Sequence, residues 1–171
     1  MLMRCEKPKV IVSQRDNVIK TVYIIGSLRN LEIPSIGNYL RELGFEVFDD
    51  WFAAGPIADD SWQDYETKRG RSYAEALHGY AAKHIFKFDL THLHRADIAL
   101  LVLPTGKSGH LEFGYFIGLG KPGYVLFDKT PDRWDQMYQF ATAVYFDKLA
   151  LGEALSDAYI SRRSNAQSPL F

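Results

Sequence analysis

The stretch ADIALLVLPTGKSGHLEFGYFIGLGKP, residues 96–122, decides how this chain folds. Residues 98–103 form an unbroken apolar run with the length of a strand that is buried on both faces. Residues 104–109 form a tight loop, and the helix behind it ends at the glycine and proline of residues 120–122, a common stop signal. This helix carries one acidic residue, Glu112, on an otherwise apolar and glycine-rich surface. A carboxylate at such a position indicates a role in either catalysis or packing.

The residues on either side repeat the alternation of strand and helix. Strands are expected at residues 20–25, 45–48, 98–103, 124–127 and 143–146. Besides the helix that carries Glu112, helices are expected at residues 34–43, 71–94, 134–141 and 149–159. Because this order produces βαβ units, we expect an open α/β fold with a mostly parallel sheet of about five strands.

Two segments between these elements matter for function. Residues 49–70 lack a regular period and predict a long loop, which in a compact domain is often a functional lid. The helix expected at 71–94 has its apolar residues at helical spacing, which predicts a face turned toward the core. That face comprises Ala74, Leu77, Tyr80, Ala81, His84, Ile85, Phe88 and Leu93.

Length and composition predict one ordinary globular domain. The 171 residues suffice for a single core, and we expect an N-terminal extension at 1–17 with a candidate strand at 10–12, a domain at 18–160 and a polar tail at 161–171. A net charge of −1 gives no electrostatic case for a nucleic-acid polymer as partner. The single cysteine and the absence of an apolar run near the ~20 residues that span a bilayer predict a soluble, cytoplasmic protein with no membrane partner.

In open parallel sheets ligands bind at the carboxyl ends of the strands, a rule that selects the loops 26–33, 49–70 and 104–109. In the first loop, Gly26 permits a close turn, Ser27 offers a hydroxyl and Arg29 offers a bidentate fork for an oxyanion. These groups suit a phosphate or a carboxylate. The alternative is a plain helix-capping turn with a solvated arginine.

The segment SGHLEFGY, residues 108–115, is the second candidate. Small residues, Gly109 among them, allow a ligand to approach the start of the helix, and Glu112 is expected in the first turn. An N-terminal position favours the ionised form of a carboxylate, which a nucleophile requires. The alternative is that Glu112 only complements the helix dipole while His110 lies on the surface.

Asp89 is the third candidate, because an acid near the end of a helix opposes the dipole and is therefore either exposed or functional. A second carboxylate beside Glu112 would fit the two-carboxylate logic of glycosyl transfer. Trp51 and the other aromatic residues of 49–70 suit stacking on a nucleobase or, alternatively, packing of that segment onto its own domain. The histidines show no metal-ligand spacing, with His92 and His94 expected at the helix end or surface.

Three motifs occur in a specific order: VYIIGSLR at 22–29, FDL at 88–90 followed by AD at 96–97, and GHLEFGY at 109–115 followed by GKP at 120–122. Together they resemble the nucleoside 2-deoxyribosyltransferase family and its nucleotide N-glycosidase relatives. The resemblance covers residues 22–127. It implies a flavodoxin-like fold with helices on both faces of the sheet, and a double displacement at the anomeric carbon of a nucleoside or nucleotide.

The resemblance also implies roles for individual residues. Glu112 matches the nucleophile, Asp89 the residue that orients the sugar or protonates the leaving base, and Tyr23 a tyrosine beside the reacting sugar. In the nucleotide-cleaving branch, Ser27 and Arg29 match a 5′-phosphate site. A serine ahead of the glutamate assists in that branch, with Ser108 as the counterpart. The complete set of expected substrate-binding residues is Gly26, Ser27, Arg29, Asp49, Trp51, Ser108, Gly109 and His110.

The leading expectation is an enzyme that cleaves or transfers at the N-glycosidic bond of a (2-deoxy)ribonucleoside or its 5′-monophosphate, through a glycosyl-Glu112 intermediate. Alternatives are a nucleoside 5′-monophosphate N-glycohydrolase, an NAD-type glycohydrolase and a non-catalytic nucleotide sensor. No metal or cofactor is expected for this chemistry. By resemblance, a homo-oligomer is expected in which neighbouring subunits complete each site.

Overall fold

The structure, a computed structural model, describes residues 19–160, so the expectations for 1–17 and 161–171 lie outside the described residues. Its elements are β1 (Thr21–Ile25), α1 (Ile33–Glu42), β2 (Glu46–Phe48), the 3-10 helix η1 (Asp50–Ala54), α2 (Ala58–Lys68), α3 (Tyr73–Leu77), α4 (Tyr80–Arg95), β3 (Ile98–Val102), α5 (Lys107–Gly118), β4 (Gly123–Leu126), the 3-10 helix η2 (Gln136–Phe140), β5 (Ala143–Tyr145) and α6 (Lys148–Tyr159). None of these helices has the length and apolar character needed to cross a membrane.

The five strands form one parallel sheet in the order β2-β1-β3-β4-β5. This is the strand order of flavodoxin-like folds, so the predicted fold class is confirmed. The central strand β3 is buried along its whole length, as its unbroken apolar run predicts. Chain connections reverse direction between β1 and β3, and ligands in such folds bind where this reversal occurs. The carboxyl ends of β1 and β3 are therefore the place to look for a site.

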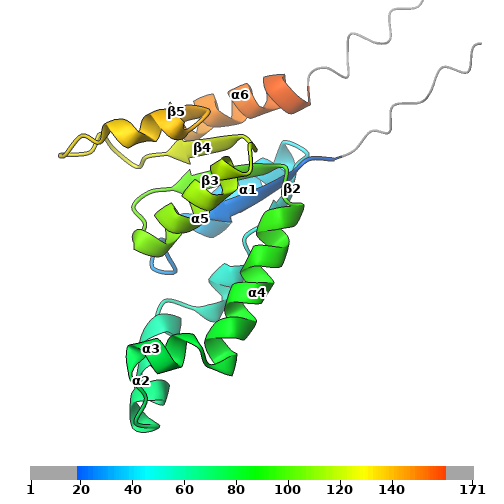
Figure 1. Ribbon diagram of the computed structural model, residues 1–171. Helices are drawn as coiled ribbons and strands as arrows, with labels where there is room; N and C mark the ends of the chain where they lie inside the picture. The colour runs from blue at the N-terminus through cyan, green and yellow to red at the C-terminus, as the bar shows by residue number, and fades with distance from the viewer. Residues whose placement is uncertain (1–18, 161–171) are drawn as a thin grey trace, which may run out of the picture.

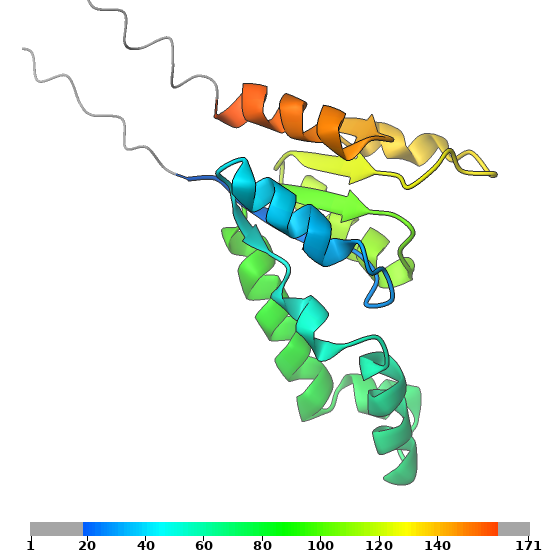
Figure 2. The ribbon, with the colours of Figure 1, turned by 180° about the vertical axis from the view of Figure 1, so that it is seen from behind.

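Helices cover both faces of the sheet. On one face, α1 and α6 pack against alternate residues of the strands, such as Val22 and Ile24 of β1 (Figure 2). On the other face, α5 and the end of α4 pack against Tyr23, Ile25 and their neighbours (Figure 1). Because successive side chains of a strand point to opposite faces, Tyr23 is directed to the α4 and α5 side.

Residues 58–88, comprising α2, α3 and the first half of α4, project away from the sheet (Figures 1 and 2). We call this segment the arm. Its base is continuous with the second half of α4, and within it the buried carboxylate of Glu66 lies 3.2 Å from the guanidinium of Arg71. This ion pair joins α2 to the residues before α3.

Three predictions of secondary structure are wrong in this part of the chain and near its end. Residues 49–70 form η1 and α2 instead of a loop; α2 is polar on nearly all sides and buries only Glu66, so it has no apolar period to detect. The helix expected at 71–94 is two helices, because Ser72 caps α3 and Gly79 begins α4. Residues 134–141 contain only the single turn η2.

The predicted inward face of the helix at 71–94 is also wrong. Of its eight residues only Leu93 is buried, and Tyr80 is 94% exposed. The physical reason is that the arm extends beyond the sheet, so the chain has no core there for these side chains to enter (Figure 1).

An added methyl group should have opposite effects on stability at two glycines on this side of the molecule. A Cβ at Gly123 of β4 would lie 2.6 Å from Ile117 and 2.7 Å from Phe113, whereas a Cβ at Gly114 of α5 would meet nothing within 4 Å. Gly123→Ala should lower the free energy of unfolding by about 2 kcal/mol through overpacking, and Gly114→Ala should raise it by about 0.5 kcal/mol through helix propensity. Urea unfolding of both variants measures this difference, and equal effects would contradict the packing described.

Candidate active site

Tyr23, Asp89 and Glu112 come together on the face of the sheet covered by α4 and α5. Tyr23 lies in the middle of β1, Asp89 in the second half of α4 and Glu112 in α5. The charge of Asp89 raises the pKa of Glu112, and both carboxylates raise the pKa of Tyr23, so all three are within electrostatic range of one another. The three residues expected to be catalytic thus form one cluster, which we call the acid cluster.

Glu112 lies in the second turn of α5, not in the first turn as expected, because the helix begins at Lys107. Burial, the larger cause, and the nearby charge of Asp89 together raise the pKa of Glu112 to about 7. The expected stabilisation of the ionised form by the helix dipole is therefore outweighed by desolvation. A carboxyl group with this pKa is present in both protonation states near neutral pH.

Asp89 is also desolvated. Burial raises its pKa, and the smaller effect of the nearby His92 lowers it. Its Oδ1 atom is buried and has no hydrogen-bond partner among residues 19–160. An unpaired buried carboxyl oxygen is costly, so such an atom is often explained by a ligand that it binds. A sugar hydroxyl or a protonated base nitrogen would satisfy it.

A stack of rings lies beside the two acids. Tyr23 stacks on Phe48 of β2 with ring centroids 5.0 Å apart, and Phe48 in turn stacks on His92 at 3.9 Å. Phe88 contacts both Phe48 and His92. Sequence reasoning missed His92 and Phe48 as parts of the site. The helical spacing of Phe88, Asp89 and His92 would have been the available signal, since residues three and four apart share a helix face.

The loop after β1 begins at Gly26, three residues beyond Tyr23. Gly26 packs under Trp51 and Ile33, where a Cβ would have to displace Ile33 at 2.6 Å. The Trp51 ring is fixed by its Nε1, which donates a hydrogen bond to the carbonyl of Ile24 at 2.8 Å. Trp51 thus packs against its own domain, at the position where the expected binding loop begins.

Two of the expected anion-binding groups in this loop are already engaged. The hydroxyl of Ser27 accepts a hydrogen bond from the backbone N–H of Arg29 at 3.2 Å. The guanidinium of Arg29 pairs with Asp60 of α2 at 2.8 Å. Asp49 is also engaged, because it forms an ion pair with Arg41 of α1.

The expected residues at the start of α5 lie on different sides of the helix. Gly109 is buried, and a Cβ there would lie 2.6 Å from Thr105 and 3.2 Å from Ile25, so this glycine lets α5 sit directly on the end of β1. Ser108 is exposed in the first turn. His110 is roughly 200° around the helix from Glu112.

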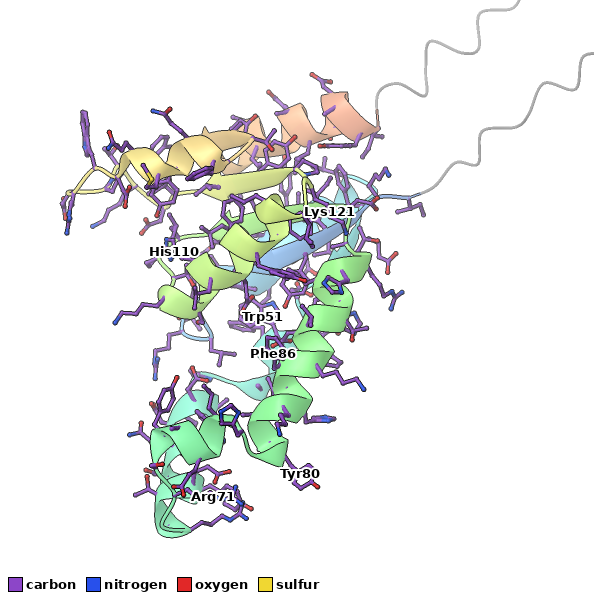
Figure 3. All side chains as sticks on the ribbon, in the orientation of Figure 1. Trp51, Arg71, Tyr80, Phe86, His110 and Lys121 are labelled. Atoms are coloured by element: carbon purple, nitrogen blue, oxygen red, sulfur yellow. The ribbon has the colours of Figure 1, made fainter. Side chains whose placement is uncertain are left out.

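His110 is held on its own flank by two contacts. Its Nδ1 lies 3.0 Å from the carbonyl of Gly106 and its Nε2 lies 3.0 Å from the hydroxyl of Tyr138. The structure therefore does not bring His110 to the acid cluster, and Figure 3 shows it at the end of α5 away from α4.

Two cavities lie outside the acid cluster. One, of about 610 Å³, is at the tip of the arm and is lined by Arg71, Ala74, Glu75, His78, Gly79, Tyr80 and Lys83. The other, of about 190 Å³, lies between α5 and η2 beside His110 and Tyr138. Neither contains Tyr23, Asp89 or Glu112. The candidate site is placed at Glu112 and Asp89 because burial raises the pKa of both acids and because they lie close together. Among residues 19–160, no three His, Cys, Asp or Glu side chains are grouped so as to hold a metal ion.

The raised pKa of Glu112 predicts a pH-dependent effect on stability. Because folding raises this pKa from 4.5 to about 7, ionised Glu112 lowers the free energy of unfolding above pH 7 and has no such effect below pH 4.5. Glu112→Gln should therefore raise the Tm by about 5 °C at pH 8 and by less than about 1 °C at pH 4.5, measured by calorimetry. Glu153→Gln, on the exposed side of α6, is the matched control. The same change of Tm at both pH values would contradict the assigned burial.

Comparisons with known proteins agree with this architecture. No family model matches the chain, and a search of curated proteins finds no significant match. Among solved structures, 19 chains match. One is a 2-deoxyribosyltransferase from the psychrotolerant bacterium Bacillus psychrosaccharolyticus, which is 20% identical to this chain with a TM-score of 0.54, over 77% of this chain and 90% of the other. At this level of identity, the chain is similar to that 2-deoxyribosyltransferase in its fold, which agrees with the flavodoxin-like fold that the sequence resemblance implies.

Proposed function

We propose that this protein is an enzyme that acts at the N-glycosidic bond of a (2-deoxy)ribonucleoside through a covalent glycosyl-Glu112 intermediate. The observation that carries the proposal is the pair of buried carboxyl groups, Glu112 and Asp89, beside Tyr23. The fold shared with a 2-deoxyribosyltransferase supports the same chemistry.

Two carboxyl groups with different environments suit the two roles of such a reaction. In the first step, an ionised oxygen of Glu112 bonds to the anomeric carbon and the bond from that carbon to the base breaks. The bonding electrons leave with the base, and Asp89 in its protonated form donates a proton to the base. Burial raises the pKa of Asp89 and so makes its protonated form more accessible than that of an exposed aspartate. The reactive form of the pair is the one in which Asp89 carries the proton and Glu112 is ionised.

In the second step, a nitrogen of an acceptor base or a water molecule bonds to the anomeric carbon. The ester bond to Glu112 breaks, which restores its carboxylate, and ionised Asp89 accepts the proton that the incoming group loses. Burial and both acids raise the pKa of Tyr23 far above its ordinary value. Its hydroxyl therefore keeps its proton and is a hydrogen-bond donor throughout.

A product assay tests the proposed reaction. Purified protein is incubated with a panel of nucleosides and 2′-deoxynucleosides, with and without a free acceptor base, and the released base and the exchanged nucleoside are separated by chromatography. Glu112→Ala should reduce turnover by at least about 10³-fold, since it removes the nucleophile. Glu153→Ala should retain full activity. Undiminished turnover in Glu112→Ala would remove the covalent mechanism.

The same panel separates transfer from hydrolysis. Formation of a new nucleoside only when acceptor base is present indicates transfer, whereas free sugar indicates that water enters the site. NAD is included as a further substrate, because cleavage of a nicotinamide–ribose bond would require the same nucleophile.

We further propose that the enzyme works as a homo-oligomer. Support comes from large apolar side chains that are exposed on α3, α4 and α5 and at the residue directly after α5. We call them together the uncovered face: Tyr73, Leu77, Tyr80, Ile85, Phe86, Phe88, Leu111, Tyr115 and Leu119. Two of them, Tyr80 and Phe86, are labelled where they project from α4 in Figure 3. Exposed apolar patches beyond a few hundred Å² are uncommon in monomers and mark association surfaces.

Light scattering after gel filtration tests this assembly. We expect a mass of at least about 39 kDa, twice the 19.5 kDa of one chain. Phe86→Glu should shift the protein toward 19.5 kDa, because it places a charge in the uncovered face. Leu149→Glu, on α6 at the opposite face of the sheet, is the matched control and should leave the mass unchanged. A wild-type protein that stays at the mass of one chain would refute the assembly.

A further inference from the structure

The ion pair between Arg29 and Asp60 connects two segments that otherwise belong to different parts of the molecule. Arg29 lies in the loop between β1 and α1, and Asp60 lies in the first turn of α2, at the start of the arm. Their side chains are 59% and 62% exposed, and the Arg29 Nη2 atom lies 2.8 Å from the Asp60 Oδ2 atom. The ion pair therefore links the loop after β1 to the start of the arm.

Arg29 follows the carboxyl end of β1, the strand whose middle residue Tyr23 belongs to the acid cluster. Gly109 of α5 packs on Ile25, the last residue of β1, and the chain continues from Ile25 into the loop that carries Arg29. The loop lies beside the start of α5 in both ribbon views (Figures 1 and 2). Glu112 is three residues beyond Gly109 and shares its side of the helix. A substrate bound at Glu112 therefore has this loop next to it.

Arg29 is the only basic residue between β1 and α1. It is also the group in this loop that would hold a phosphate by a bidentate contact. Asp60 neutralises that guanidinium, and the hydroxyl of Ser27 is turned to the loop's own backbone. As a result, the one cationic side chain of the loop is already paired with a carboxylate.

We propose that Asp60 is a specificity-determining residue that makes the site select an uncharged nucleoside over a nucleoside 5′-monophosphate. The inference rests on the proposed function, of which it names the substrate class. A phosphate would have to displace the Asp60 carboxylate from Arg29 and remain close to that carboxylate. Specificity arises in this way when a site carries a group that penalises the competing ligand.

The exposed position of the pair makes it a clean target for mutation. Ion pairs between exposed side chains contribute little to stability, so replacing Asp60 should leave the fold intact. Asp60→Asn removes the carboxylate with almost no change of shape, and Asp59→Asn removes the same charge one residue earlier, at a position without an ion pair to Arg29.

The experiment measures kcat/KM for a 2′-deoxynucleoside and for its 5′-monophosphate in the wild type and both variants. We expect the wild type to prefer the nucleoside. In Asp60→Asn the ratio of the monophosphate value to the nucleoside value should rise about tenfold, as expected of one charge-assisted hydrogen bond at an exposed site. Asp59→Asn should change the ratio by less than about twofold. Adding Arg29→Ala to Asp60→Asn should abolish the gain.

Calorimetric binding of the 5′-monophosphate gives a second readout that needs no turnover, with a Kd about tenfold lower in Asp60→Asn than in the wild type. A wild type that prefers the monophosphate, or an unchanged ratio and Kd in Asp60→Asn, overturns the role of Asp60 while leaving the proposed reaction intact. The opposite result, no cleavage of any substrate together with the tenfold gain in binding, supports the role of Asp60 and removes the proposed reaction.

Discussion

Glu112 and Asp89 are withdrawn from water on the same side of the sheet, and the rest of the site depends on this. Desolvation raises the pKa of both groups, and the charge of Asp89 adds to the effect on Glu112. Taking two carboxyl groups out of water costs free energy, which the packing of α4 and α5 on the sheet must offset. Gly109 and Gly123 permit that packing, because a side chain at either position would push α5 or its neighbours away.

The two faces of the sheet divide the work between stability and chemistry. The α1 and α6 face is a predominantly apolar core, in which the hydroxyls of Tyr124 and Tyr159 pair with each other. The α4 and α5 face combines apolar packing with the polar groups of the site. On this face, the aromatic stack of Tyr23, Phe48 and His92 lies between the apolar side chains and the two acids. One strand serves both faces: Val22 and Ile24 stabilise one side of β1, and Tyr23 contributes to the site on the other.

The parts that could be predicted from the sequence are those with a local signal. The apolar run of β3 and the alternation of strands and helices predict the sheet, and the ordered motifs around Tyr23, Asp89 and Glu112 predict the acid cluster. The arm could not be predicted from hydrophobic period, because α2 is polar and the apolar residues of α4 have no core to enter. Its one clear local signal is the capping box of Ser72 and Glu75, which marks the start of α3. The pairing of Arg29 with Asp60 has no sequence signal, since the partners come from separate elements whose approach depends on the whole fold.

The register between β1 and β3 has a consequence for the order in which the protein is made. Val22 pairs with Ile98 and Ile25 with Leu101, so β1 can find its central neighbour only after α1, β2 and the entire arm have been synthesised. Contacts between residues so distant in the chain form slowly, because a long loop must close first. Glu112 emerges later still, behind β3. During synthesis, the N-terminal half of the chain therefore lacks for a time the central strand that organises it, and the side chains of β1 that are buried in the finished fold have no central neighbour to cover them.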